Sequence, residues 1–216
     1  MEHKLSIMER IIDQYRKPTG LFGTLLGREM NHGHGPLRHW GLSYIVLGAD
    51  AIILDVGCGG GKGVQELAQS SPQGKVYGID HSKHMVQLAR TVNKTLIKKG
   101  QVEIQYGDVS ALPFPENMFD LVMASESYYF WPNLIDDLTE IRRVLKLGGT
   151  LLIVNEIYQN EAFEKGNKNF ARWAGMMTFH IHTPDETRDY LTKAGYLAVV
   201  IDEIRQKNWI AVRAIK

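Results

Sequence analysis

ILDVGCGGGKG, residues 53–63, joins an apolar run to a glycine-rich turn. The run AIILDV, residues 51–56, has the pattern of a strand that is buried on both faces of a parallel sheet. The glycines permit positive φ angles and let a ligand approach the backbone, and the helix predicted over residues 62–69 offers free N–H groups at its N-terminus. We therefore expect a polar or anionic group of a ligand to lie against this turn.

Two common nucleotide-binding motifs fit this turn poorly. Gly57 and Gly59 begin the dinucleotide-binding motif G-x-G-x-x-G, but Lys62 stands where the third glycine belongs. The phosphate-binding loop G-x-x-x-x-G-K-[ST] needs other residues at two positions, which are Val56 and Gly63 in this chain. The turn is therefore expected to bind a different kind of group.

The rest of the chain alternates between strand and helix patterns. Apolar runs predict strands over residues 75–80, 102–108, 119–125, 150–156, 196–204 and 208–216, the last two close enough to form an antiparallel hairpin. Amphipathic patterns with capping residues predict helices over residues 82–100, 133–149 and 183–195. This order predicts an α/β fold with a doubly wound, mostly parallel seven-stranded sheet. The loops at the carboxyl ends of its strands should ring one site.

The composition favours one soluble domain. Of the 216 residues 44% are hydrophobic, enough for one well-packed core. The 25 basic and 24 acidic residues give a formal charge of +1, which favours neither nucleic acid nor an anionic membrane as a partner. The lone Cys58 leaves no internal disulfide, and no signal-peptide pattern or apolar run of about 18 residues is present. We expect a cytoplasmic protein.

Four motifs occur in the order in which one enzyme family has them. They are DVGCG at residues 55–59, GID at residues 78–80, GDVSALPFPENMFDLV at residues 107–122 and EIRRVLKLGGTLLI at residues 140–153. Over residues 51–155 the chain resembles class I S-adenosylmethionine-dependent methyltransferases, in particular the type 11 and the ubiquinone and menaquinone methyltransferases. MNHGHGPLRHWGL, residues 30–42, also resembles a segment of a bacterial and archaeal subgroup. The resemblance implies a Rossmann-like fold, S-adenosylmethionine as cofactor and S-adenosylhomocysteine as product.

The same resemblance suggests how the chain is divided. We expect residues 1–48 to form an N-terminal helical cap or lid, beginning with an amphipathic helix that ends near residue 17. Residues 49–216 are expected to form the cofactor-binding methyltransferase domain, with a cap insertion at about residues 157–182.

The expected cofactor-binding residues are Asp55, Gly57, Cys58, Gly59, Asp80, His81, Met85, Asp108, Val109 and Ser125. Asp55 is a poor neighbour for a pyrophosphate and a good one for an ammonium group. Asp80 lies 19 residues beyond Gly61, a separation like that which places a carboxylate on ribose hydroxyls in nucleotide-binding folds. Cys58 has no predicted partner that would activate its thiol, so we expect it to serve packing.

The adenine ring is expected to lie beyond the ribose. His81 and Met85 can cover its face, because an aromatic ring and a thioether both pack well on flat π surfaces; packing in the core is the alternative for Met85. Asp108 matches the family position that accepts a hydrogen bond from the adenine amine, with the backbone of Val109 nearby.

Two segments are candidates for the acceptor pocket. In the first, residues 124–133, we expect Tyr129 and Trp131 to wall the pocket and Glu126 to orient or deprotonate the substrate, while Phe130 packs a helix against the sheet.

The second segment is residues 30–42, where the resemblance suggests a lid. Asn31 and Trp40 are expected to contact substrate. His34 is a candidate general base whose pKa would lie near neutrality.

No metal is expected. His32 and His34 form one H-x-H pair, and His180 and His182 form another. Neither pair has a carboxylate or a cysteine at a firm ligand spacing, so ordinary polar loop histidines are the favoured interpretation.

The favoured function is methyl transfer to a small molecule, since no basic stripe or appended recognition domain is present. The alternatives are a methyltransferase that acts on RNA or protein, a noncatalytic S-adenosylmethionine-binding regulator and a nicotinamide oxidoreductase. The lone cysteine argues against arsenite methylation, which in similar enzymes depends on several. We expect no membrane or nucleic-acid partner and a monomer or a homodimer; the acceptor atom stays open between C, N, O and S.

Overall fold

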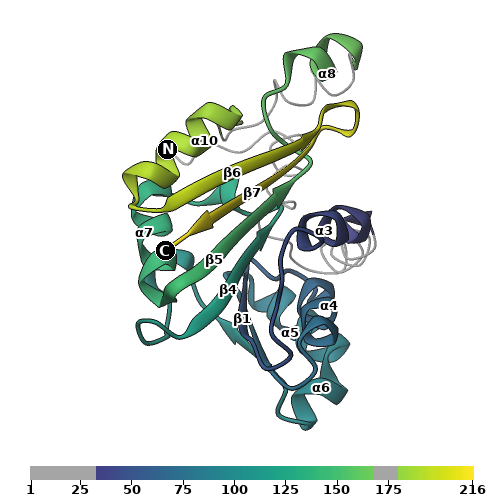
Figure 1. Cartoon of the computed structure of the whole chain (residues 1–216). Coiled ribbons are helices and arrows are strands. Elements are labelled where there is room, and N and C mark those ends of the chain that lie inside the picture. Colours follow the sequence, from purple (N-terminus) through teal and green to yellow (C-terminus); the bar gives the residue numbers. More distant parts are fainter. Residues whose placement is uncertain (1–32, 168–179) are drawn as a thin grey trace, which may run out of the picture.

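The computed structural model of the chain describes residues 33–167 and 180–216, and its centre is a seven-stranded sheet in the order β3-β2-β1-β4-β5-β7-β6 (Figure 1). The strands are β1 (Ile52–Val56), β2 (Lys75–Asp80), β3 (Val102–Tyr106), β4 (Phe119–Ser125), β5 (Leu145–Asn155), β6 (Leu197–Ile204) and β7 (Trp209–Ile215). The first five are parallel, and β7 lies antiparallel between β5 and β6. The predicted fold class and the C-terminal hairpin are confirmed.

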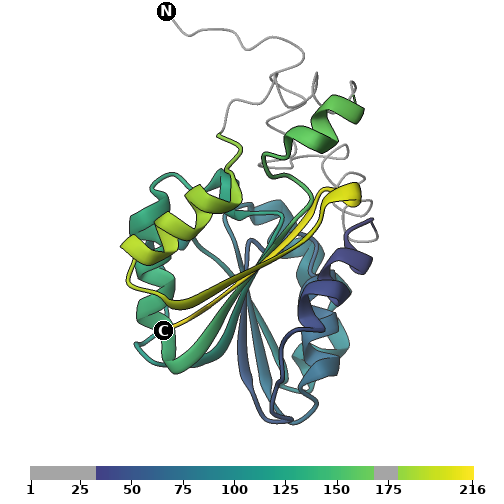
Figure 2. The ribbon, with the colours of Figure 1, turned by 45° about the horizontal axis from the view of Figure 1, so that its top comes forward.

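Helices cover both faces of this sheet (Figures 1 and 2). One face carries α3 (Gly35–Leu42), α4 (Lys62–Ser70), α5 (Lys83–Val92) and the short α6 (Lys94–Lys98). The other carries α7 (Leu134–Val144) and α10 (Pro184–Lys193). Three short 3-10 helices, η1 (Val109–Ala111), η2 (Tyr128–Phe130) and η3 (Arg205–Lys207), lie in connecting loops, and α8 (Glu161–Gly166) follows β5.

The apolar run of β1 is continuous because successive side chains enter two different cores. Ile53 belongs to the core under α3, α4 and α5, and Leu54 to the core under α7 and α10, and both are fully buried. Burial of a side chain of this size contributes about 1.5–3 kcal/mol. The strand is thus held from both sides, which keeps the turn after it in place.

Two predicted helices are wrong in extent, and the strand predicted over residues 150–156 begins earlier, at Leu145. The helix predicted over residues 82–100 breaks at Asn93, whose side-chain amide donates hydrogen bonds to the carbonyls of Gly61 and Ala89 at 2.8 and 3.0 Å. The helix predicted over residues 133–149 ends at Val144, because Leu145 already pairs with Phe119 in the sheet. Both errors come from contacts between segments far apart in the sequence.

The capping box at the start of α10 is confirmed. The hydroxyl of Thr183 accepts a hydrogen bond from the backbone N–H of Glu186 at 3.1 Å, and the Glu186 carboxylate accepts one from the N–H of Thr183 at 2.8 Å. This reciprocal pair satisfies two backbone donors at the helix N-terminus. It also sets the direction of the Glu186 side chain.

The proposed lid is described only from residue 33 on, so the helix predicted before residue 17 and Asn31 lie outside the described residues. Within the described part, α3 packs on the sheet and buries Leu37 completely in the core. The predicted insertion at about residues 157–182 contains α8, which lies next to η3. No helix in the two described ranges has the length and apolar character that a bilayer crossing requires.

Candidate functional site

A pocket opens at the carboxyl ends of β1, β2 and β4, where the strand order reverses beside β1. Crevices at this position are the usual ligand sites of open α/β sheets. Its lining residues are His34, Arg38, Asp55, Val56, Gly57, Cys58, Gly59, Gly60, Gly63, Ile79, Asp80, His81, Met85, Asp108, Val109, Ser125, Glu126, Ser127, Phe130, Trp131 and Pro132. All ten predicted cofactor-binding residues are among them.

The turn after β1 adopts backbone conformations that favour glycine. Gly57 has a φ of +73°, and a Cβ there would lie 2.6 Å from Cβ of Ser127, so a larger residue would be both strained and in collision. Gly59 has a φ of +49°, and a Cβ there would meet nothing within 4 Å. At Gly59 the open space belongs to the pocket, so a ligand can approach the backbone.

Asp80 holds this turn in place from the end of β2. Its Oδ2 accepts a hydrogen bond from the N–H of Gly59 at 2.8 Å, and its Oδ1 accepts one from the N–H of Ser82 at 2.7 Å. Burial raises the pKa of Asp80, and the two hydrogen bonds oppose that rise. Each carboxylate oxygen has a second lone pair, so Asp80 can also accept bonds from a ligand's hydroxyl groups.

Acidic side chains gather at the glycine-rich end of the pocket. Burial, together with the charges of Asp80 and Glu66, raises the pKa of Asp55 to about 7, although the guanidinium of Arg38 lowers it. Arg38 itself forms an ion pair with Glu66, with Nε and Oε2 2.8 Å apart. A cationic group of a ligand would therefore be attracted to Asp55, and its binding would favour the ionised carboxylate.

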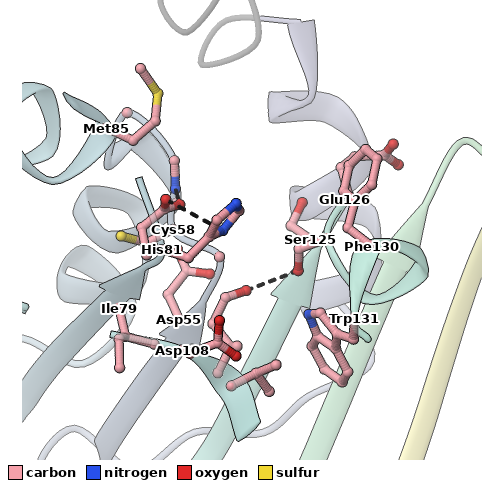
Figure 3. A pocket seen from close by; sticks show the side chains of 18 of the residues that line it. Asp55, Cys58, Ile79, His81, Met85, Asp108, Ser125, Glu126, Phe130 and Trp131 are labelled. Carbon is pink, nitrogen blue, oxygen red and sulfur yellow. Dashed lines mark hydrogen bonds and ion pairs between the residues drawn. The ribbon is translucent and has the colours of Figure 1, made fainter. Parts of the chain in front are cut away.

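His81 and Met85 lie together at one side of the pocket with Cys58, opposite Glu126, Phe130 and Trp131 (Figure 3). Met85 is 2% exposed, so it both packs in the core and faces the pocket.

The carboxylate of Asp108 accepts a hydrogen bond from the N–H of Ser110 at 3.1 Å and stays exposed at the pocket edge. Burial raises the pKa of the Cys58 thiol, which agrees with the predicted packing role.

Glu126 follows β4 in a left-handed conformation with a φ of +55°, which is uncommon outside glycine. One carboxylate oxygen accepts a hydrogen bond from the hydroxyl of Tyr129 at 2.8 Å, and the other accepts one from the N–H of Glu156. Burial nevertheless raises the pKa of Glu126 to about 8. Strained backbone and a shifted carboxyl pKa in a pocket are features that cluster at functional sites.

Three of the substrate-side predictions need correction. Tyr129 is buried behind the pocket, and its hydroxyl holds Glu126. Trp40 is absent from the lining and packs instead on Tyr44 and Trp209, with ring centroids 5.7 and 6.0 Å away. His34 does line the pocket, but burial and the charge of Arg38 lower its pKa to about 4, not to a value near neutrality. Each difference arises from a tertiary contact.

Sequence reasoning missed several pocket residues, above all Arg38. Arg38 and Glu66 lie 28 residues apart, and no local pattern predicts that they meet. Phe130 packs against the core as expected, but it also lines the pocket with Ser127 and Pro132. The density of aromatic residues after β4 was the available signal for this part of the site.

Comparisons with known proteins match the chain to methyltransferases. The family model described as a methyltransferase domain matches residues 54–153. An O-methyltransferase, cnsE, of Penicillium expansum is 31% identical over 154 residues, which are 71% of this chain and 55% of that protein. A demethylmenaquinone methyltransferase of Lactococcus lactis is 36% identical over 130 residues, which are 57% of this chain and 51% of that protein. The chain spans about half the length of these curated relatives.

One solved structure with the same fold is a SAM-dependent methyltransferase from Aquifex aeolicus. The two structures superpose with a TM-score of 0.72 and 23% sequence identity, and the match covers 88% of this chain and 96% of that one.

Proposed function

The chain belongs to the class I S-adenosylmethionine-dependent methyltransferases, and from this premise we propose that it transfers a methyl group from S-adenosylmethionine to a small-molecule acceptor. The observation that carries the proposal is one pocket in which three carboxylates, Asp55, Asp80 and Asp108, come from or directly follow three neighbouring parallel strands. A curated O-methyltransferase and a demethylmenaquinone methyltransferase are similar to the chain, which supports a small acceptor.

In this proposal each group of the cofactor has a candidate partner in the pocket. Asp55 suits the ammonium group and Arg38 suits the carboxylate of the amino-acid end, since both line the pocket beside the glycine-rich turn. Asp80 would accept hydrogen bonds from the ribose hydroxyls.

At the far end of the cofactor, His81 and Met85 would cover the adenine ring, and Asp108 would accept a hydrogen bond from its amine. Val109 follows Asp108 and also lines the pocket, so its backbone is available to the same ring.

A buried polar atom supports a bound ligand independently. The hydroxyl of Ser125 has no hydrogen-bond partner among the described residues, although it is buried and its residue lines the pocket. Buried hydroxyl groups are nearly always paired in folded proteins, because leaving one unpaired costs about 1–3 kcal/mol. A ligand in the pocket can supply that partner.

Bound S-adenosylmethionine supplies a methyl group already activated on a sulfonium, so an acceptor lone pair forms the new bond while the sulfur–carbon bond breaks and leaves its electrons on sulfur. The protein then has to align the acceptor, exclude water and, where the acceptor carries a proton, remove it. Phe130 and Trp131 wall the side of the pocket opposite Met85 (Figure 3). They would align an acceptor by packing against it.

Glu126 is the group proposed to remove that proton. The Tyr129 hydroxyl and the Glu156 backbone N–H fix the direction of its carboxyl group. A general base works best when its pKa lies near the operating pH, and burial brings the pKa of Glu126 to about 8. With its pKa of about 4, His34 would be a much weaker base.

Calorimetric titration with S-adenosylhomocysteine tests the cofactor assignment, and a screen of pooled metabolites with a labelled methyl donor then tests for transfer. We expect saturable binding of S-adenosylhomocysteine and a labelled small-molecule product. Absence of binding would overturn the whole proposal. Binding without transfer to any acceptor would overturn the catalytic part and favour a regulator that binds the cofactor unchanged.

A further inference from the structure

A cluster of potential metal ligands lies outside the pocket, at the start of α10. One ligand atom each from His180, His182 and Glu186 lies within 4.8 Å of the other two. In the sequence the His180 and His182 pair has no carboxylate at a firm ligand spacing, and for that reason no metal is predicted. The capping box supplies the missing carboxylate, because it turns Glu186 back toward the residues that precede the helix. We propose that these three side chains form a binding site for a divalent transition-metal ion of the zinc type.

The distances within the cluster suit such an ion. Nε2 of His180 is 3.2 Å from Oε1 of Glu186. With zinc–ligand bonds of about 2.0–2.2 Å, neighbouring ligands of a tetrahedral ion lie about 3.3 Å apart. His180 and Glu186 therefore already have the separation of two ligands, and the ligand atom of His182 lies within 4.8 Å of both.

Two of the three ligands are held in place before any ion binds. Oε2 of Glu186 accepts the hydrogen bonds of the cap from the N–H and the hydroxyl of Thr183, at 2.8 and 3.2 Å, so Oε1 can bind an ion while the cap persists. The His182 ring is in contact with Tyr128 and Tyr190, at centroid distances of 5.6 and 5.2 Å. Preorganised ligands lose little conformational freedom on binding.

His182 carries a second, independent indication of a ligand. The residue is 8% exposed, and its Nδ1 is buried without a hydrogen-bond partner among the described residues. Imidazole nitrogen is a common zinc ligand, and an unpaired buried polar atom calls for such a partner.

The electrostatics of the site partly oppose and partly favour a cation. The N-terminus of a helix carries a partial positive charge, which disfavours a metal ion there. The first turn of α10 also carries two acidic residues, Asp185 and Glu186, whose charges offset that effect. Three protein ligands leave a fourth tetrahedral position for water.

The ion would join the end of the predicted insertion to the wall of the pocket. His182 contacts Tyr128, which lies in η2 between the pocket-lining residues Ser127 and Phe130. We assign the ion a structural role at this junction, where it would connect residues 180–182, α10 and η2.

The test uses the full chain after dialysis against a chelator, titrated with zinc alone and, for its visible spectrum, with cobalt(II). The variants are His180→Ala, His182→Phe and Glu186→Gln. Phenylalanine at position 182 keeps an aromatic ring against Tyr128 and Tyr190. Glutamine at position 186 keeps the capping box, because that motif accepts glutamate or glutamine there. His39→Ala is the matched control, an exposed histidine of α3 outside the cluster.

We expect one zinc per chain and a loss of affinity of at least about tenfold in each of the three variants, with no change in His39→Ala. Circular dichroism shows whether each variant folds. If His182→Phe does not fold, the zinc affinities of His180→Ala and Glu186→Gln test the site. No zinc binding, or affinity unchanged in any folded variant of the three, would overturn the site. Neither outcome bears on binding of S-adenosylhomocysteine, which is measured separately.

Discussion

The guanidinium of Arg38 and the carboxylate of Glu66 form a two-point ion pair beside the glycine-rich turn, with Nε–Oε2 and Nη2–Oε1 distances of 2.8 and 3.1 Å. The two side chains are only 6% and 10% exposed. Arg38 lies on α3 and Glu66 on α4, so the pair ties the segment before β1 to the helix after the turn. The same guanidinium lowers the pKa of Asp55. The ion pair between α3 and α4 therefore also positions a charge that acts on the pocket.

Removal of one member of this pair should destabilise the protein strongly. Arg38→Met leaves the charge of Glu66 buried without this partner, and loss of a buried partner costs roughly 3–5 kcal/mol of unfolding free energy. The double variant Arg38→Met/Glu66→Met should recover much of that loss, because both charges are gone. Urea denaturation measures all three, with Lys165→Met in the exposed Lys165–Glu161 pair as a control that should change little. A single variant as stable as the parent chain would contradict the prediction.

Asp80→Asn should weaken binding of S-adenosylhomocysteine by roughly 10- to 100-fold. Asparagine has nearly the size of aspartate, but it loses the charge that accepts the proposed ribose hydroxyl bonds, and hydrogen bonds to a charged group contribute about 1.5–3 kcal/mol. Isothermal titration calorimetry measures the affinity. Asp202→Asn, which removes a charge on β6 that is paired with Arg213 on β7, is the control. Equal affinities in the two variants would remove Asp80 from the cofactor site.

The contribution of Asp55 to the stability of the free protein should fall as the pH rises from about 4 to about 7. In this range the folded state holds a proton on Asp55, whose pKa is about 7, while the unfolded chain with its ordinary pKa has lost it. At this carboxyl the native state therefore binds more protons, and each rise in pH favours unfolding. Asp55→Asn should remove this contribution to the pH dependence of stability. The urea midpoints of the parent chain and the variant, measured at a series of pH values, report the difference. Glu126, whose pKa is raised, acts in the same direction, whereas His34 and His182, whose pKa values burial lowers to about 4, act in the opposite direction.

Binding of S-adenosylhomocysteine should become tighter as the pH rises through about 7. The ammonium group of the ligand favours the ionised form of Asp55, so complex formation below pH 7 has to release its proton. Titrations in two buffers with different ionisation enthalpies report that release directly. Asp55→Asn should show weaker binding and no proton release at this group. Proton release of the same size in the variant would assign the titration to another residue.

Glu126→Gln should lower kcat by about 100-fold or more with little change in KM for the cofactor, since general base catalysis contributes roughly 10²–10⁴ in rate. The kcat of the parent protein should rise with pH through about 8, where Glu126 loses its proton. Tyr129→Phe removes a hydrogen bond that favours the ionised form, so the same rise should move to higher pH. The labelled-methyl assay with the acceptor from the screen provides the rates. An unchanged pH profile in both variants would leave Glu126 with an orienting role alone.

Much of the pocket could be predicted because strand ends and turns are local features. The glycine-rich turn and Asp80 are predicted from local pattern and spacing, Asp108 and Val109 from the family resemblance, and all ten predicted cofactor-binding residues line one pocket. The acceptor side was harder, since Trp40 and Tyr129 are aromatic residues whose partners are distant in the sequence or buried. Aromatic composition alone does not distinguish a pocket wall from a core contact.

The sequence by itself determined the order of strands and helices, the left-handed turn after β1 and the cap of α10, because each depends on hydrogen bonds and backbone preferences within a few residues. Only the tertiary structure decided that Arg38 meets Glu66, that burial lowers the pKa of His34 and raises that of Glu126, and that Glu186 lies beside His180 and His182. Those properties depend on burial and on charges brought in by other segments. Neither can be read from local spacing, since desolvation and Coulomb interactions act through space.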